Sequence, residues 1–244
     1  MPEVKATTDQ LLGGRVVVRQ PEGGYRAAID PVLLAAAVRA KAGQRVLDAG
    51  CGTGAAMFCL AARLPGLLLS GLEVQHAYAV LAGEGIALNK LADTFIIEGD
   101  ILRPPPDILN TFDILLTNPP YGDAGTPPPD AGLKIAHMEG EADVEDWIKA
   151  CLACLAPKGR LVMIHRADRL SEILAALHAH NAGDIRTLPI YPKAGTPARR
   201  VIIDAGKGRR SPDTLLGGLV LHELDGKYTA AAEAVLRDAR ALAL

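Results

Sequence analysis

The sequence predicts an α/β fold built on a doubly wound, mostly parallel sheet of seven strands, and two observations support this prediction. Short apolar runs alternate with segments of helical periodicity, which is the pattern of successive βα units. Hydrophobic residues make up 49% of the 244 residues, but aromatic residues only 4%. Aliphatic helices packed on an aliphatic sheet have this composition, so we expect an interior of that kind.

Residues 1–40 are expected to form a small N-terminal extension, a hairpin over 15–26 followed by a helix, packed on the core. Asp30 directly precedes Pro31, which is the order of an N-cap residue and a proline in the first helical turn. Residues 41–244 are expected to complete the same domain, because a chain of 244 residues suits one domain with small additions.

The rest of the chain alternates between predicted strands and predicted helices. The strands are expected at 45–48, 67–72, 95–98, 112–117 and 159–165, with a closing pair at 185–189 and 201–204. The helices are expected at 55–64, 77–91, 141–155, 170–180 and 229–244. Residues 122–140 contain consecutive prolines and are expected to be a long loop, a kind of segment that often acts as a lid or binding element. In sheets of this kind ligands bind at the carboxyl ends of the strands, so the residues that follow the strands are the candidate site.

Charge and cysteine content narrow the class of protein. The formal net charge of −2 demands no polyanionic partner, although it leaves room for a local basic patch. The chain has neither a basic and apolar leader nor an apolar run of ~18 residues, so we expect no secretion signal and no membrane span. Its four cysteines are too few and too unevenly spaced for a secreted disulfide scaffold. We therefore expect a cytoplasmic protein, and a monomer rather than an oligomer.

A glycine-rich turn, Asp48-Ala49-Gly50-Cys51-Gly52-Thr53-Gly54, follows the first strand of the predicted sheet. Its alternate glycines allow a tight turn and let a ligand lie against bare main chain. The spacing G-x-G-x-G differs from the G-x-G-x-x-G of dinucleotide-binding proteins. By itself this turn would only indicate a strand-to-helix connection.

Acidic residues at the ends of the next two strands indicate that the glycine-rich turn is part of a ligand site. Glu73 ends the second strand, where a carboxylate can bind both hydroxyls of a ribose. Asp100 follows the third strand, where a carboxylate or a nearby amide can bind an adenine amino group. One acidic residue at a strand end is usually a turn or a cap, but three at neighbouring strand ends, counting Asp48, indicate a nucleoside site.

This series of motifs resembles the class I S-adenosylmethionine-dependent methyltransferases, which have a Rossmann-like fold. The resemblance implies S-adenosyl-L-methionine as cofactor and S-adenosyl-L-homocysteine as product. The residues that it implies for cofactor binding are Asp30, Asp48, Gly50, Cys51, Gly52, Gly54, Glu73, Val74, Asp100, Ile101 and Asn118.

Asn118-Pro119-Pro120-Tyr121, after the fourth strand, matches the N-P-P-Y signature of amino and amide N-methyltransferases. Such a target nitrogen is a poor nucleophile because its lone pair is delocalised. The Asn118 side-chain oxygen and the Pro119 carbonyl can accept its two N–H groups and favour a pyramidal nitrogen, while the prolines fix φ and lack N–H donors. Tyr121 offers an aromatic face to a planar target. Catalysis would then rest on positioning and electrostatics, with no strong base; alone, the prolines would merely end the strand.

The order of the motifs over most of the chain resembles the bacterial tRNA1(Val) (adenine-37-N6)-methyltransferase family. In that family a segment of the form T-D-x-V-L-L precedes the glycine motif and lines the methionine end of the cofactor. Here Ile29 replaces the threonine, so only Asp30 carries over. The resemblance implies methylation of adenine N6 in RNA, with tRNA as the partner.

Three other functions remain open at this stage. A protein glutamine-N5 methyltransferase uses the same N-P-P-Y chemistry but usually has a helical N-terminal domain, for which the stretch before the glycine motif leaves no room. Ribosomal RNA guanine-N2 methyltransferases often have a duplicated domain and N-P-P-F. A non-catalytic binding module is disfavoured by the intact Asp48, Glu73, Asp100 and Asn118.

Several other polar residues have weaker signals. Cys151 and Cys154 lie in a predicted helix without a second ligand pair, so we expect buried thiols and no metal site. His137 and His165 are expected to form local hydrogen bonds and not to act as bases. Basic residues of the C-terminal third are either a solvated face or an RNA phosphate contact. These residues are Lys193, Arg199, Arg200, Lys207, Arg209 and Arg210.

Overall fold

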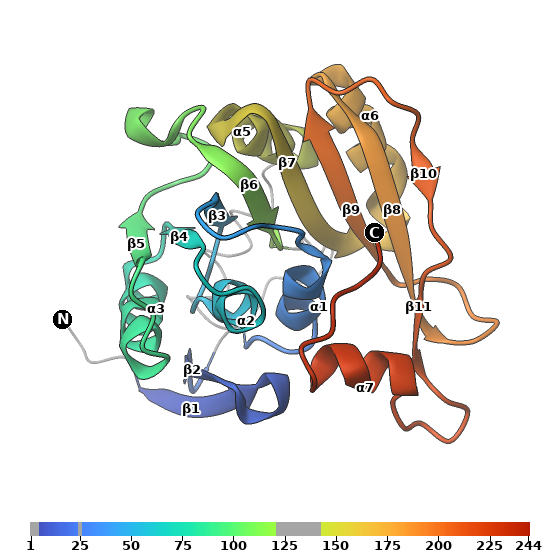
Figure 1. The fold of residues 1–244 in the computed structure, drawn as a ribbon, viewed down its shortest axis with the longest axis horizontal. Helices are drawn as coiled ribbons and strands as arrows, with labels where there is room; N and C mark the ends of the chain where they lie inside the picture. Colours follow the sequence, from blue (N-terminus) through green and yellow to red (C-terminus); the bar gives the residue numbers. More distant parts are fainter. Residues whose placement is uncertain (1–4, 24–25, 121–142) are drawn as a thin grey trace.

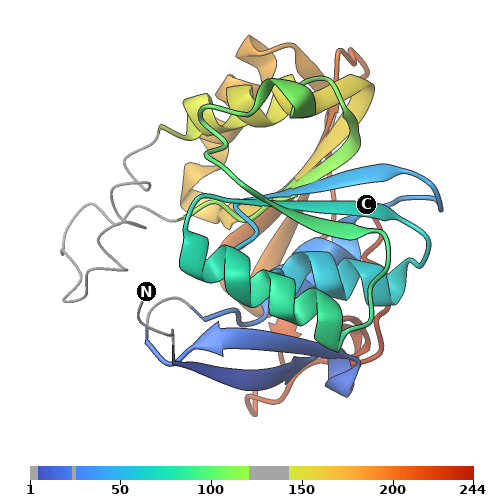
Figure 2. The same ribbon diagram turned by 90° about the vertical axis from the view of Figure 1, so that its left-hand side faces the viewer.

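A computed structural model describes residues 5–23, 26–120 and 143–244 and shows a central sheet with helices on both faces (Figures 1 and 2). The sheet has the order β10-β8-β9-β7-β6-β3-β4-β5, and β11 also pairs with β8. Its strands are β3 (Arg45–Ala49), β4 (Leu68–Glu73), β5 (Thr94–Glu98), β6 (Phe112–Thr117), β7 (Leu155–Arg166), β8 (Ala182–Lys193), β9 (Arg200–Lys207), β10 (Thr214–Leu215) and β11 (Leu219–His222). β9 runs antiparallel to β7 and β8, and the other pairs are parallel. The seven predicted strands are confirmed, and the short strands β10 and β11 add to the sheet beside β8.

Two groups of helices cover the sheet. Figure 2 shows one group above the sheet and another below it. The helices are α1 (Asp30–Ala37), α2 (Ala55–Arg63), α3 (His76–Leu88), α5 (Val144–Cys154), α6 (Leu170–Ala179) and α7 (Ala230–Leu236). The buried side chains form two apolar clusters, one shared with α1, α2 and α7 and the other with α5 and α6. The sheet is therefore doubly wound, as predicted. None of the described helices is long and apolar enough to cross a membrane.

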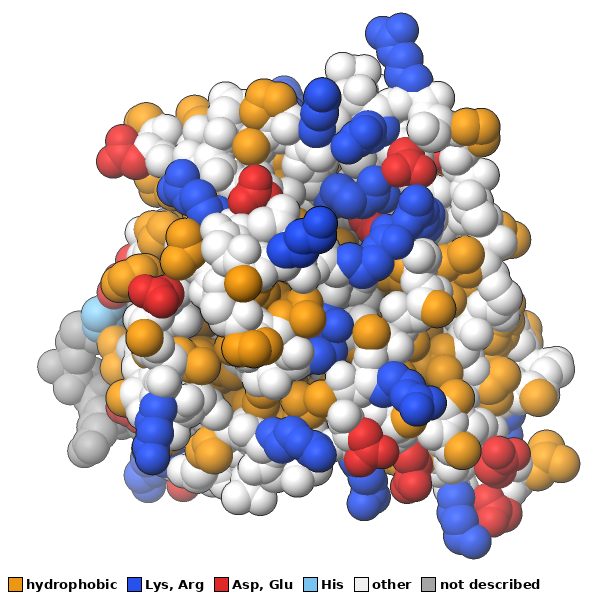
Figure 3. All heavy atoms as spheres, viewed as in Figure 1, with side chains coloured by type: hydrophobic (Ala, Val, Ile, Leu, Met, Phe, Trp, Pro, Cys, Tyr) orange, Lys and Arg blue, Asp and Glu red, His pale blue; other side chains and the backbone are white. Residues whose placement is uncertain are grey.

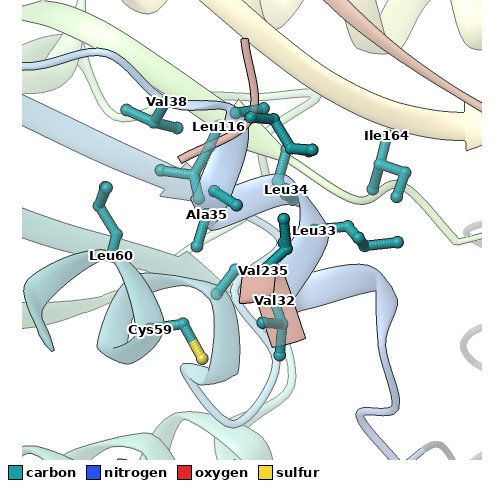
Figure 4. Close-up of a cluster of buried hydrophobic side chains, with 14 of the residues drawn as sticks. Val32, Leu33, Leu34, Ala35, Val38, Cys59, Leu60, Leu116, Ile164 and Val235 are labelled. Carbon is teal, nitrogen blue, oxygen red and sulfur yellow. The ribbon is translucent and has the colours of Figure 1, made fainter. Parts of the chain in front are cut away.

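The α1 helix is enclosed on all sides. All eight of its residues are buried, and Figure 4 shows its Val32, Leu33 and Leu34 among side chains of α2, β6, β7 and α7. A helix that is apolar all round needs such an environment. Burial fixes the position of α1 and, with it, of Asp30 at its first turn.

The N-terminal hairpin consists of β1 (Ala6–Leu11) and β2 (Val16–Pro21), which pair antiparallel. Val16 and Val18 of β2 join the buried cluster of α1 and α2. The Asn89 side chain, just after α3, exchanges two hydrogen bonds with the Val17 main chain, of 2.9 and 2.6 Å. The hairpin predicted over 15–26 therefore contained only the second strand of the pair.

Two local predictions are wrong. Asp30 is the first residue of α1 and not its N-cap, which is Ile29, and no side chain caps this helix. The Asp30 carboxylate instead pairs with Arg200 of β9, with 2.5 Å between Oδ1 and Nε. The C-terminal helix ends at Leu236, because the chain turns back through Ala239 in a left-handed conformation. The predicted loop 122–140 lies outside the described residues.

Candidate active site

The candidate site lies along the edge of the sheet where β6, β3, β4 and β5 end side by side. Ala49 of β3 is in register with Leu72 of β4 and with Thr117 of β6. Glu73 at the end of β4 is in register with Glu98 at the end of β5. The register therefore brings together the glycine-rich turn, Glu73, the segment after β5 and Asn118, as expected for a switch-point site.

The glycine-rich turn is held against β4 by its own main chain. The Gly50 and Cys51 amides both donate to the Leu72 carbonyl, at 2.9 and 3.0 Å. Gly50, Gly52 and Gly54 have φ of 70°, 55° and 83°, a left-handed conformation that disfavours side chains. A Cβ on Gly52 would meet no atom within 4 Å, so its main chain is open to a ligand.

Two buried carboxylates stand behind this turn. Glu73 accepts hydrogen bonds from the Gly52 amide at 2.8 Å and from the Gln75 amide at 2.9 Å. Asp48 accepts one from the Met57 amide of α2 at 3.2 Å. Burial raises the pKa of Asp48 to about 7, and the neighbouring Glu73 charge adds to the effect. Burial also raises the pKa of Glu73, against the lowering effect of its backbone hydrogen bonds. Such carboxylates favour a ligand rich in hydrogen-bond donors or positive charge.

The remaining residues of the proposed cofactor set flank these carboxylates. Asp100 is largely occupied locally, because its carboxylate accepts from the Leu102 amide at 2.9 Å and pairs with Arg103 at 3.1 Å. Ile101 is buried, Val74 is 46% exposed, and the Cys51 side chain is buried. A glycine turn open at Gly52, a buried acid and an apolar side chain fit a nucleoside cofactor.

The segment after β6 is tied to the glycine turn by two side chains that the sequence did not indicate. The Thr117 hydroxyl donates to the Ala49 carbonyl at 2.8 Å and accepts from Trp147 Nε1 of α5 at 3.1 Å. The Trp147 ring lies against Gly50, where a Cβ would be 3.2 Å from it. The one feature of the sequence that could have pointed to Trp147 is that it is the single tryptophan of the chain.

Asn118, Pro119 and Pro120 directly follow Thr117, with Asn118 half-buried and Pro119 buried. Tyr121 lies outside the described residues, as does His137. Asn118 is thus one residue from the Thr117–Ala49 link and next in the chain to the edge that carries the glycine turn.

A histidine, His165, lies near the end of the neighbouring strand β7. Met163 of β7 is in register with Thr117, and His165 follows two residues later. Burial lowers the pKa of His165 to about 4, and the nearby Arg166 and Arg169 charges contribute. Its imidazole is therefore neutral near pH 7.

The six basic residues of the C-terminal third do not form one surface. Lys193, at the end of β8, and Arg199 and Arg200, at the start of β9, lie at the edge that carries the site. β9 runs away from this edge, so Lys207 and the following Arg209 and Arg210 lie at the opposite one. Lys207 is turned inward, where its Nζ donates to the Leu155 carbonyl at 2.6 Å and to Asn110 at 3.0 Å.

The cysteines of α5 belong to the apolar core. Cys151 and Cys154 are buried free thiols, and burial raises the pKa of both. Within the described part of the chain, no three His, Cys, Asp or Glu side chains form a cluster that could hold a metal ion.

Comparison with known proteins places the chain in a family. Residues 27–180 match the family model described as "Methyltransferase small domain". Two curated relatives are tRNA1(Val) (adenine(37)-N6)-methyltransferases. The one from Aeromonas hydrophila is 28% identical over 202 residues, covering 82% of this chain and 84% of the relative. The one from Porphyromonas gingivalis is 32% identical over 195 residues, covering 75% and 76%.

Solved structures give the same fold. A predicted O-methyltransferase from Agrobacterium tumefaciens superposes with a TM-score of 0.73 at 26% identity, covering 88% of this chain and 98% of its own. The T. thermophilus 16S rRNA N2 G1207 methyltransferase, solved with AdoMet and guanosine, superposes with a TM-score of 0.59 at 20% identity over 84% of this chain and 51% of its own. The second likeness concerns the fold alone. The chain belongs to the methyltransferase small domain family and is an S-adenosylmethionine-dependent methyltransferase.

Proposed function

We propose that the enzyme methylates the exocyclic N6 of adenine in RNA, with a tRNA as substrate in the cytoplasm. The observation that carries this proposal is the position of Asn118-Pro119-Pro120, directly after Thr117, whose hydroxyl is bonded to the Ala49 carbonyl beside the glycine turn. An acceptor side chain and a donor-free turn thus adjoin the proposed cofactor site. The names of the curated relatives support adenine N6 and tRNA.

The cofactor would lie over the glycine turn. In this proposal Glu73 binds the two ribose hydroxyls, and the main chain of Gly50, Cys51, Gly52 and Gly54 forms the floor. Asp48 and Asp30 face the methionine end, since each is buried at the start of a helix or turn on that edge. Val74, Asp100 and Ile101 would contact the adenine of the cofactor.

The target amino group would be held by hydrogen-bond acceptors. The Asn118 oxygen and the Pro119 carbonyl accept its two N–H groups, and Pro119 and Pro120 add no competing donor because proline lacks an amide hydrogen. The bound cofactor supplies the electrophilic methyl group. The Asn118 oxygen and the Pro119 carbonyl would stabilise the positive charge that the target nitrogen gains when it takes up this methyl group. The target nitrogen would then lose a proton to solvent. Tyr121 would stack on the target adenine.

The phosphates next to the target nucleotide would meet basic side chains of the same edge. Arg199 is exposed there, and Lys193 and Arg200 are half-buried. Arg166 of β7, in register with Arg200, is 40% exposed and belongs to the same group. Arg200 also pairs with Asp30, so it would link the RNA-facing edge to the cofactor site.

The decisive experiment compares parent, Asn118→Ala and Asn118→Asp with labelled cofactor and total RNA from a strain that lacks the enzyme, followed by nucleoside analysis. We expect labelled N6-methyladenosine from the parent and a single-turnover rate ~10²–10³ lower for Asn118→Ala, by analogy with loss of an oxyanion-hole donor. Asn118→Asp keeps an acceptor oxygen and should retain more activity. Cofactor affinity should change only a few-fold. Label in guanine or in protein, or a near-parental rate for Asn118→Ala, would refute the proposal.

A further inference from the structure

Arginines gather on one face of the sheet, toward the edge opposite the active site. The amino-edge patch consists of Arg39 after α1, Arg160 near the start of β7, Arg186 of β8 and Arg209 after β9. Figure 3, viewed as in Figure 1, shows Lys and Arg side chains gathered over β7, β9 and β8, with few acidic side chains among them. A chain with a net charge of −2 thus concentrates positive charge at this edge.

Two aspartates hold the inner part of the patch in place. Asp204 is 2% exposed and pairs with Arg160 Nε at 2.5 Å and with Arg39 Nη2 at 2.7 Å. Asp184 pairs with Arg160 Nη1 at 2.7 Å. Arg160 also donates to the Asp184 and Asp204 carbonyls. Arg160 therefore acts as a support, with its donors already used inside the protein.

The outer arginines of the patch have N–H groups available to a ligand. Arg186 is in register with Asp204 on the same face of the sheet, but its nearest ion-pair distance is 3.8 Å, to Asp184. Arg209 packs over Gly206, beside Arg160, and its side chain is exposed. Arg209 and the adjacent Arg210 line one open hollow, and neither donates to another side chain among the described residues.

The charge of the patch is not cancelled by its aspartates. Three arginines, Arg160, Arg186 and Arg209, act on Asp184 and lower its pKa, so this carboxylate stays ionised and is outnumbered. Exposed Lys41, Lys158 and Arg210 extend the positive surface. Arginine has a planar fork of donors that matches a phosphate, which makes partly held arginines well suited to a phosphate backbone.

We propose that the amino-edge patch binds the phosphate backbone of the RNA substrate at a distance from the target nucleotide. This inference rests on the proposed function, since it takes RNA as the partner. β9 spans eight residues from Arg200 at the active-site edge to Lys207 at the opposite edge, roughly 23 Å at ~3.3 Å per residue. The two edges would therefore contact separate parts of one folded RNA, and the remote contact would favour a structured RNA over a short strand.

The test uses two double variants with the same change in net charge. Arg209→Glu with Arg210→Glu alters exposed side chains of the patch region, far from Asn118. Lys149→Glu with Arg237→Glu alters exposed side chains in the middle of α5 and just after α7, away from Lys193 and from the patch, and serves as the matched control. Binding of the cognate tRNA transcript is measured by fluorescence anisotropy at several salt concentrations, with urea unfolding to show that all proteins are equally stable.

We expect the patch variant to bind tRNA at least ~10-fold more weakly near 0.1 M salt, with a log–log salt slope reduced by about 1–2, since each lost phosphate contact removes ~0.7–0.9. Its kcat at saturating tRNA should match the parent while KM rises. The control should bind within about two-fold of the parent if the contact is local. Equal weakening in both variants, or none in the patch variant, would overturn the inference while leaving the proposed function intact. A parent protein that binds no RNA would overturn both.

Discussion

At Glu73 a single carboxylate serves both the fold and the proposed cofactor site. It accepts the Gly52 and Gln75 amides, so it shapes the glycine turn, and it is 5% exposed beside the open Gly52 main chain. A substitution that removes the whole side chain would therefore mix a structural effect with a binding effect. Glutamine is the smaller change: it keeps the side-chain length and one acceptor oxygen, and its NH2 group replaces the oxygen that accepts from the other of these two amides.

We expect Glu73→Gln to bind S-adenosylmethionine about 10- to 100-fold more weakly, because hydrogen bonds to a charged group are worth ~1.5–3 kcal/mol. Isothermal titration calorimetry measures this directly. Glu98→Gln is the matched control: Glu98 is in register with Glu73 one strand away, but its side chain is 54% exposed, and its affinity should equal the parent's. Unchanged affinity for Glu73→Gln would remove the ribose assignment.

The residues of the candidate site differ in how far they could be predicted. Gly50, Gly52, Glu73 and Asn118 were identifiable because their type and their place after a strand indicate their chemistry. The Asp30–Arg200 and Thr117–Trp147 contacts were not, since each joins segments far apart in the chain. Only the topology brings β9 to α1 and α5 to the end of β6.

At the scale of elements, α3 contains two glycines in different environments. Gly83 is exposed, and a Cβ there would meet no atom within 4 Å. Gly85 is buried against the ring of Phe58 from α2, which occupies the space that a Cβ would need. Helix propensity favours alanine at both positions, but packing opposes it at one.

We expect Gly83→Ala to stabilise the protein by ~0.5–1 kcal/mol through helix propensity, and Gly85→Ala to destabilise it by ~1–3 kcal/mol through overpacking. Urea unfolding followed by circular dichroism measures both changes. The two variants are each other's control, because the substitution and the helix are the same. If both shift the free energy of unfolding in the same direction, the close packing of α2 on α3 at Gly85 is wrong.

Element boundaries were predictable where hydrophobic period and turn residues agree, as in β3, β4 and β6. β1 was not predicted because its residues, Ala6–Leu11, are mostly polar and it lies in a two-stranded sheet of its own. The tail was predicted too long because residues 237–244 continue an apolar helical pattern. Tertiary contact prevails there: the Leu242 amide donates to the Ala36 carbonyl at the end of α1.

At the scale of the molecule, the sheet separates two edges for which we propose different roles. The carboxyl edge carries the proposed cofactor and target sites, and the amino-edge patch lies toward the opposite edge. From the sequence, the basic residues of the C-terminal third read as one cluster. Because β9 runs from Arg200 at the active-site edge to Lys207 at the opposite edge, this single strand separates the first three of these residues from the last three.

Asp204 connects the parts that meet at the amino edge. Its ion pair with Arg160 joins β9 to β7 and, through Asp184, to β8. Its ion pair with Arg39 joins β9 to the segment after α1. The Arg39 guanidinium also donates to the Leu244 carbonyl at 2.9 Å. Removing one partner of a buried ion pair leaves the other charge without compensation, which is far more costly than losing a surface pair. Asp204→Ala would leave Arg160 with Asp184 alone and Arg39 without a carboxylate.

We therefore expect Asp204→Ala to lower the free energy of unfolding by about 2–4 kcal/mol, somewhat less than for a fully buried pair because Arg160 and Arg39 are 22% and 44% exposed. Asp168→Ala, which removes the 59% exposed partner of Arg166, is the control and should cost less than about 1 kcal/mol. Urea titration gives both values from the midpoint at unchanged slope. Because the Asp204 carboxylate pairs with Arg39 and Arg160 and with no residue of the proposed cofactor site, cofactor affinity at a temperature well below the transition should stay at the parental value. Equal losses for the two variants would show that the network around Asp204 contributes no more than a surface ion pair to holding α1, β7 and β9 together.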